Sequence, residues 1–204
     1  WGDVEAAFAR AAAVVEGEYY FPMAYAYAME PYVAIAEVSE NGVTIYSSAQ
    51  HPFMVRNDLT SVLNLPLNQV RLVVPFVGGG YGSKSYTKIE PLVVACALKA
   101  GRPVKLQLSV EEAILTTRSD DALTWMRTAV DKTGKIIARQ AKIYLNTGAY
   151  AENSPLVAEK AANRAVGPYS IPNVEITCSA VYTNTVPASS FRGFGCAQVT
   201  TAGE

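Results

Sequence analysis

The sequence contains little histidine and little cysteine. His51 is the single histidine among 204 residues, which excludes a histidine-rich metal cage. The three cysteines, Cys96, Cys178 and Cys196, are odd in number and show no Cys-x-x-Cys spacing. This pattern favours reduced thiols in a cytosol-like compartment over a disulfide scaffold, and Cys96, inside an apolar run, is expected in the core. We therefore expect a cytoplasmic protein without a zinc or iron centre held by its own side chains.

Charged residues are also scarce. They make up 17% of the sequence, with a formal net charge of −1. No basic patch is present, which excludes the electrostatic signature of a nucleic-acid-binding surface. No apolar run reaches the ~18–20 residues that a membrane-spanning helix needs. The chain starts at Trp1 instead of methionine, so we expect it to be a piece of a longer protein.

Apolar periodicity predicts helices and strands that are mixed along the chain. Helices are expected over 3–13, 51–63 and 90–100, and strands over 14–21, 32–38, 43–46, 67–76, 104–108, 123–131, 136–145 and 174–183. Asn41-Gly42 and residues 132–135 are hairpin signals. The acidic pairs at 111–112 and 120–121 are expected on solvated faces or at caps. This mixture favours an α+β fold, with mixed sheets, hairpins and packed helices.

A glycine-rich segment, Val77-Gly-Gly-Gly-Tyr-Gly-Ser-Lys84, follows the predicted strand over 67–76; we call it the glycine loop. A Walker A phosphate loop needs glycine immediately before the lysine, and Ser83 stands there. A dinucleotide-binding fingerprint fails at the same residue. Because glycine lets a backbone approach closely, the loop is either shaped around a ligand or a tight turn that packs a strand against a helix.

A second segment, Phe191-Arg-Gly-Phe-Gly195, again interleaves glycine with aromatic residues around a cation; we call it the arginine loop. We expect the two loops to contribute to one site. Together they offer backbone N–H groups, a guanidinium and aromatic faces. Such groups suit an anionic, planar, polar ligand.

The two loops resemble those of a known family. Residues 78–84 resemble the GGGFGGK loop of the molybdenum hydroxylases, the family of xanthine dehydrogenase and aldehyde oxidoreductase, and residues 191–195 resemble their (F/Y)RGFG loop. Further family motifs follow in the same order: Met29-Glu-Pro31, Ser47-Ser-Ala-Gln50, Gly101-Arg-Pro-Val104, Thr147-Gly-Ala-Tyr150 and Ile171-Pro-Asn-Val174. Each motif is short, but their order identifies the chain as a member of this family, with the fold of its molybdopterin-binding domain.

The resemblance implies a molybdenum ion held by the dithiolene of a pterin cofactor, with no side-chain ligand. The cofactor is molybdopterin, with its cytosine dinucleotide form as an option. The residues implied to contact it are Gln50, Gly79, Gly80, Tyr81, Gly82, Arg192 and Gly193. Gln50 would donate a hydrogen bond to the apical oxo group of the metal, near the main chain of Tyr81. Without the resemblance, Gln50 would be an ordinary amide at a strand end and Arg192 a surface arginine.

Substrate contacts are implied for Phe194, Ser85 and Lys160. Phe194 would offer an aromatic face to a planar substrate, although a core role is its alternative. Ser85 stands where purine-hydroxylating members carry a glutamate, which argues against a xanthine-like substrate. Lys160 falls near a substrate-orienting arginine of those enzymes, and Arg164 competes for that role. A cation there suits a heteroaromatic acid or an aldehyde.

The implied activity is oxidation of a heteroaromatic or aldehyde substrate, with water as the oxygen source. Iron–sulfur and FAD domains or subunits would take the electrons. The catalytic glutamate of the family lies downstream of the arginine loop. We therefore expect residues 1–204 to be a single domain or the excised first part of the molybdopterin-binding region, without its second half and inactive alone. The runner-up is a non-redox module that binds phosphate or a nucleotide through the glycine loop.

Overall fold

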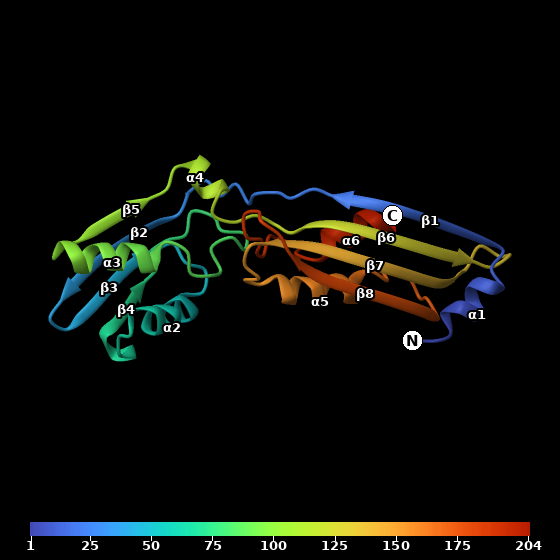
Figure 1. Cartoon of the computed structure of the whole chain (residues 1–204), viewed down its shortest axis with the longest axis horizontal. Helices are drawn as coiled ribbons and strands as arrows, with labels where there is room; N and C mark the ends of the chain where they lie inside the picture. The colour runs from blue at the N-terminus through green and yellow to red at the C-terminus, as the bar shows by residue number, and fades with distance from the viewer. The chain divides into compact units, whose positions relative to one another are not determined.

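The computed structural model describes residues 1–204, and its strands form two four-stranded sheets (Figure 1). The first sheet has the order β1 (Ala13–Phe21), β6 (Asp121–Val130), β7 (Ile136–Gly148), β8 (Asn173–Tyr182). The second has the order β4 (Val70–Val73), β3 (Gly42–Ser47), β2 (Val33–Ser39), β5 (Val104–Gln107). Each sheet belongs to its own compact unit. The first unit comprises Trp1–Ala24 and Ser119–Glu204, and the second comprises Tyr25–Arg118.

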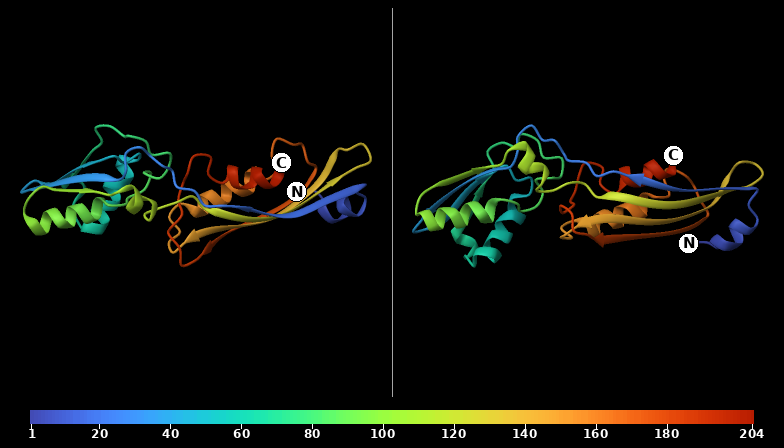
Figure 2. Two further views of the ribbon diagram at one scale, coloured as in Figure 1. Left: turned by 90° about the horizontal axis from the view of Figure 1, so that it is seen from above. Right: turned by 45° about the horizontal axis from the view of Figure 1, so that its top comes forward.

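In the first unit, two helices cover one face of the sheet. Helix α5 (Ser154–Arg164) packs on β7 and β8, and α6 (Cys196–Gly203) packs on β6 and β1 (Figure 2). Strands β1, β6 and β7 are antiparallel, whereas β8 runs parallel to β7. The short helix α1 (Val4–Ala9) begins at Asp3, whose carboxylate accepts the Ala6 N–H as an N-cap. The core between sheet and helices contains Met126, Ile143, Leu145, Val157 and Val199.

In the second unit, α2 (Pro52–Leu63) and α3 (Glu90–Ala100) lie on one face of the smaller sheet (Figure 2). Strands β2 and β3 form a hairpin, and β4 runs parallel to β3. The short helix α4 (Val110–Ile114) follows β5. The core contains Ile45, Val55, Leu59, Val93 and Val94. None of the helices combines the length and apolarity that a membrane crossing requires.

The α+β class is confirmed, and the predicted strands and helices form with shifted ends. The strand expected over 67–76 is wrong in its extent, because β4 covers only Val70–Val73 after a 3₁₀ turn, η1 (Leu67–Gln69). Helices α4 and α5 were not predicted. Both carry start signals: Ser109 and Glu112 form a capping box for α4, and Pro155 lies in the first turn of α5.

Two predictions about burial are wrong. Cys96 is exposed, because α3 turns Glu90, Val93, Val94 and Ala97 toward the core and Cys96 away from it. Asp120 is 1% exposed and therefore not on a solvated face. Its carboxylate accepts a hydrogen bond from the Ser154 hydroxyl at 2.6 Å, at the start of α5. The other acidic pair lies on α4, where Glu112 completes the capping box as predicted for a cap.

Candidate functional site

The glycine loop has a defined backbone conformation. Gly79 and Gly82 have φ of +99° and +106°, which favour glycine. Tyr81 lies between them at φ +55°, a left-handed conformation that costs a residue with a Cβ roughly 1–2 kcal/mol. The Ser83 N–H and hydroxyl both donate to the Gly80 carbonyl, at 2.9 and 2.8 Å. The loop is therefore a structured turn, and it holds the Tyr81 side chain 45% exposed.

Gln50 lies against this loop through both its main chain and its side chain. Its N–H donates to the Lys84 carbonyl at 2.9 Å, and its Oε1 accepts the Gly82 N–H at 2.9 Å. A Cβ on Gly80 would lie 2.3 Å from Gln50 Oε1, so a side chain there would displace the amide. Glycine at position 80 thus leaves room for the Gln50 side chain. With Oε1 occupied, Gln50 Nε2 remains as a hydrogen-bond donor.

A partly buried ion pair lies beside the same loop, with Glu30 31% exposed. Lys84 is 3% exposed, and its Nζ is 2.7 Å from Glu30 Oε2. Glu30 also accepts the Gly78 N–H at 2.9 Å. Partial burial tends to raise the pKa of Glu30, but hydrogen bonds from Lys84 and Gly78 and the charge of Lys84 hold the pKa below its usual value. The sequence contained the Met29-Glu-Pro31 motif, but no pattern in it indicated this pairing.

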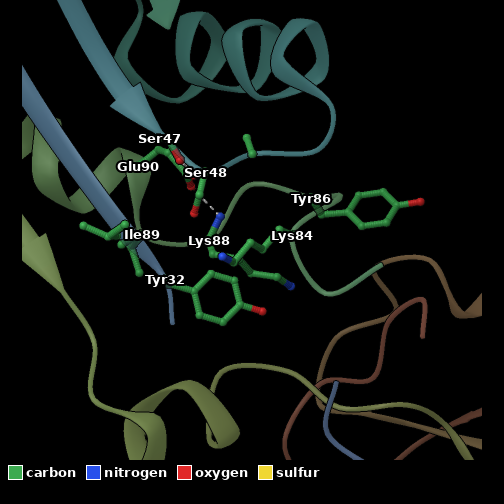
Figure 3. A pocket seen from close by; sticks show the side chains of 10 residues that line it. Tyr32, Ser47, Ser48, Lys84, Tyr86, Lys88, Ile89 and Glu90 are labelled. Atoms are coloured by element: carbon green, nitrogen blue, oxygen red, sulfur yellow. Dashed lines mark hydrogen bonds between the residues drawn. The ribbon is translucent and has the colours of Figure 1, made fainter. Parts of the chain in front are cut away.

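A small cavity of about 10 Å³ is lined by Lys84 at the end of the loop and by Glu90 (Figure 3). Glu90 is buried; it accepts the Ser47 hydroxyl at 2.6 Å and the Lys88 N–H at 2.8 Å. Such a volume holds one water molecule and no larger ligand. Ser85, expected to contact substrate, is itself buried at 6% exposure. A ligand of this loop therefore has access on the side where Tyr81 is exposed.

The arginine loop belongs to the first unit and leads directly into α6. Gly195, at φ +73°, lies against the backbone of α5, where a Cβ would be 2.6 Å from the Val157 carbonyl oxygen. Gly193 has φ +80° but no atom within 4 Å of the space for a Cβ. The positive φ explains why glycine is favoured at position 193. Steric crowding does not, because the space beside it is open.

The side chains of this region differ in exposure. Phe194 is half-buried and packs against the core of the first unit. Arg192 is exposed and has no hydrogen-bond or ion-pair partner in the chain. Lys160, on α5, is partly exposed and lies 3.5 Å from Glu159 Oε1. Arg192 and Lys160 are thus accessible cations, as is the exposed Arg164 at the end of α5, and Phe194 supplies an aromatic ring that packs partly against the core.

A buried polar cluster lies next to the start of α5 and α6. Besides the Ser154 hydroxyl, Asp120 accepts the Gln198 Nε2 through its main-chain carbonyl at 3.1 Å. Gln198 Oε1 is buried without a hydrogen-bond partner. Burial and the charge of Asp120 raise the pKa of the Cys178 thiol to about 12. This cluster was missed in the sequence, where Asp120 was expected to face solvent.

The predicted site residues thus fall into two groups. The second unit brings Gln50 together with the glycine loop, including Gly79, Gly80, Tyr81 and Gly82. The first unit contains the arginine loop and Lys160, whose main chain lies beside Gly195. No group of three or more His, Cys, Asp or Glu side chains could hold a metal ion. The donors available to an anionic ligand are instead amide groups in the second unit, and the Arg192 guanidinium and Lys160 ammonium in the first.

Comparison with known proteins identifies the family. Residues 1–204 match the model of the molybdopterin cofactor-binding domain, and the chain belongs to this family. It is 36% identical over 205 residues to a probable xanthine dehydrogenase subunit of Bacillus subtilis (strain 168), covering 98% of the chain and 27% of that protein. It is 32% identical over 206 residues to the nicotinate dehydrogenase large molybdopterin subunit of Eubacterium barkeri, covering 100% of the chain and 48% of that protein.

A solved structure agrees with these relatives. The aldehyde oxidoreductase from Desulfovibrio gigas superposes with a TM-score of 0.95 at 28% identity, covering 100% of this chain and 23% of that protein. The chain therefore spans a quarter to a half of the length of these relatives. The α+β prediction and the family resemblance are both confirmed.

Taken separately, each unit offers accessible groups that fit a molybdopterin cofactor. The Gln50 amide is fixed by its oxygen, which leaves its nitrogen to donate to an oxygen-bearing ligand. The exposed Arg192 guanidinium matches the phosphate that such a cofactor carries. Gly79 and Gly82, on either side of Tyr81, have positive φ and no side chain, so the backbone of the loop is accessible there. Each of these features suits an anionic ligand that approaches the backbone closely.

Proposed function

We propose that this chain forms part of the catalytic, molybdopterin-binding region of a molybdenum hydroxylase. The substrate is a heteroaromatic compound or an aldehyde, and water is the oxygen source. The observation that carries the proposal is the Gln50 amide, fixed by Gly82 and packed on Gly80, in a chain of the molybdopterin cofactor-binding family.

Within this proposal, Gln50 donates through Nε2 to the cofactor, and the backbone of Gly79–Gly82 lies beside it. Arg192 and Gly193 contribute a guanidinium and an unobstructed backbone. The bound molybdopterin, in its simple or cytosine dinucleotide form, supplies the two-electron oxidation. The chain's own residues position the cofactor and polarise it through hydrogen bonds. No side chain ligates the metal.

Substrate recognition is proposed for Phe194, Lys160 and Ser85. An aromatic face on Phe194 would contribute roughly 0.5–1.5 kcal/mol beyond area burial to a planar substrate. The partly exposed Lys160 suits a carboxylate, and one relative is named for nicotinate, a heteroaromatic acid. Ser85 is buried, and its N–H donates to the Gly82 carbonyl at 3.0 Å, so its proposed influence on substrate is exerted through the conformation of the glycine loop.

The working enzyme needs parts beyond this chain. We propose iron–sulfur and FAD domains or subunits as electron acceptors, together with the remainder of the molybdopterin-binding subunit, which supplies the catalytic glutamate. The names of the relatives as subunits support an assembly of this kind. Residues 1–204 alone are expected to be inactive, and the assembly is expected in the cytoplasm.

The decisive measurement is the molybdenum and pterin content of the complete protein, purified from its host with its partners. About one of each per copy supports the proposal. A folded complex with neither overturns it. In that case, stabilisation by inorganic phosphate, measured as a rise in Tm with ligand concentration, identifies a phosphate-binding module instead.

A further inference from the structure

The glycine loop is joined at its two ends by a single carboxylate oxygen. Glu30 Oε2 accepts the N–H of Gly78, at the start of the loop, at 2.9 Å, and lies 2.7 Å from Lys84 Nζ, at its end. Both ends of the loop therefore close on one atom. Since backbone N–H groups and ammonium groups are both donors, an ionised carboxylate satisfies the two at once.

Further contacts fix Glu30 to the loop from its own main chain. The Glu30 N–H donates to the Gly78 carbonyl at 3.0 Å, so these two residues exchange hydrogen bonds through backbone and side chain. A Cβ on Gly78 would lie 2.5 Å from Glu30 Cβ. Gly78 is thus glycine because Glu30 packs directly on it. The contact at Gly78 and that at Lys84 form one unit, which we call the carboxylate latch.

The latch is linked to Gln50 through Lys84. Lys84 has Glu30 as its ion-pair partner, and its carbonyl accepts the Gln50 N–H at 2.9 Å. The Tyr32 hydroxyl donates to the neighbouring Ser83 carbonyl at 3.0 Å. Movement of Lys84 would therefore change the position of Gln50 as well as the end of the loop. An uncompensated ammonium in a 3% exposed position would favour such movement.

We propose that Glu30 and Lys84 are positioning residues, whose ion pair holds the glycine loop so that Gln50 and the backbone at Tyr81 face the cofactor. In this role neither residue contacts substrate. The inference rests on the proposed function for the role of Gln50, but the latch itself is a property of this chain. It assigns to the Met29-Glu-Pro31 motif a task that its sequence alone did not indicate.

The test is a double-mutant cycle of Glu30→Gln and Lys84→Met in the complete protein. Amide hydrogen exchange of residues 77–85 is read by mass spectrometry, which does not depend on cofactor chemistry. Each single variant is expected to speed exchange about tenfold or more, as loss of a charge-assisted hydrogen bond does. In the Glu30→Gln background, Lys84→Met should add no further increase. Additive effects, or exchange as slow as in the wild type, would overturn the latch.

Two controls separate a positioning role from general damage. Glu5→Gln breaks the exposed ion pair with Arg127, at 2.8 Å in the first unit, and should leave loop exchange unchanged. Glu30→Asp keeps the charge but shortens the reach, so it serves if Glu30→Gln does not fold. In the loaded enzyme, Glu30→Gln should lower kcat about tenfold with KM within about twofold, because substrate is not contacted. A change confined to KM would contradict the positioning role.

The outcome is distinguishable from failure of the proposed function. If the wild-type complex contains no molybdenum, the assignment of Gln50 to the cofactor fails. Loop exchange in the same samples still decides whether Glu30 and Lys84 hold the loop.

Discussion

Gln50 accepts the Gly82 N–H through its side-chain oxygen at 2.9 Å, and this single bond defines which end of its amide is available. A backbone N–H is always a donor, so the facing amide atom must be the oxygen. The nitrogen, with two hydrogens, is left for a ligand. The same bond thus organises the loop and orients a donor toward the proposed cofactor.

Two substitutions of Gln50 test whether its Nε2 donor takes part in turnover. Gln50→Glu keeps an oxygen for Gly82 but removes the amide donor, whereas Gln50→Ala removes both. We expect both variants to retain most of their molybdenum and to lose about 10²-fold in kcat, the scale for loss of one preorganised donor. Metal analysis and steady-state kinetics check this. Wild-type rates in Gln50→Glu would show that Nε2 has no part in turnover.

Gly80→Ala is expected to displace the Gln50 side chain. The new Cβ would lie 2.3 Å from Oε1, so the flexible side chain must move away and lose its bond from the Gly82 N–H, at a cost of about 0.5–1.5 kcal/mol. We expect a lower Tm and slower turnover. Gln50→Ala deletes the side-chain atoms that the new Cβ would meet, so Gly80→Ala should lower Tm less in the Gln50→Ala background than in the wild type. Gly134→Asn is the matched control, because Gly134 has φ +83° and open space, which asparagine tolerates. A Gly80→Ala protein as stable as the wild type would contradict the clash.

Arg192→Ala is expected to affect cofactor content without affecting folding. The side chain is exposed and has no partner in the chain, so its removal should leave Tm nearly unchanged. The molybdenum and pterin content should fall. Arg10→Ala, another exposed arginine of the first unit, should change neither. Thermal unfolding and metal analysis on the same preparations decide the matter. Full cofactor content in Arg192→Ala would show that the guanidinium does not bind the cofactor.

Cys178 is expected to resist thiol reagents up to alkaline pH. Burial and the charge of Asp120 raise its pKa to about 12, so the reactive thiolate is almost absent at pH 8–9. The exposed Cys96 should react first. Alkylation followed by peptide mass spectrometry measures both residues in one sample. Because a raised pKa suppresses the thiolate below that pH, Cys178 should be modified only after denaturation. Rapid native labelling would show that the core is open at that strand.

The sequence predicted local structure better than long-range pairing. The hairpins at Asn41-Gly42 and at residues 132–135 and the helix over 90–100 depend on adjacent residues, and each formed as expected. The ion pair of Glu30 with Lys84 joins residues 54 positions apart, and no composition or period encodes it. Cys96 was misplaced because its apolar neighbours surround the whole helix, so hydrophobicity alone did not indicate the buried face.

The candidate site was found through short motifs. Gln50 and the glycine loop were predicted together, and the structure places them in contact. Their roles toward a cofactor remain predictions. The reason for Gly80 was only partly foreseen, because the space beside it is filled by a protein side chain, which a sequence pattern cannot show.

The first unit is interrupted by the second, and this has a consequence for biosynthesis. Strand β1 pairs along its length with β6, and the Ala24 N–H donates to the Ser119 hydroxyl across a sequence separation of 95 residues. At about 5–20 residues per second, a ribosome needs several seconds to deliver that partner. During this interval β1 presents an unpaired edge. Residues 25–118 can fold meanwhile, which reduces the chain entropy lost when the two halves of the sheet join.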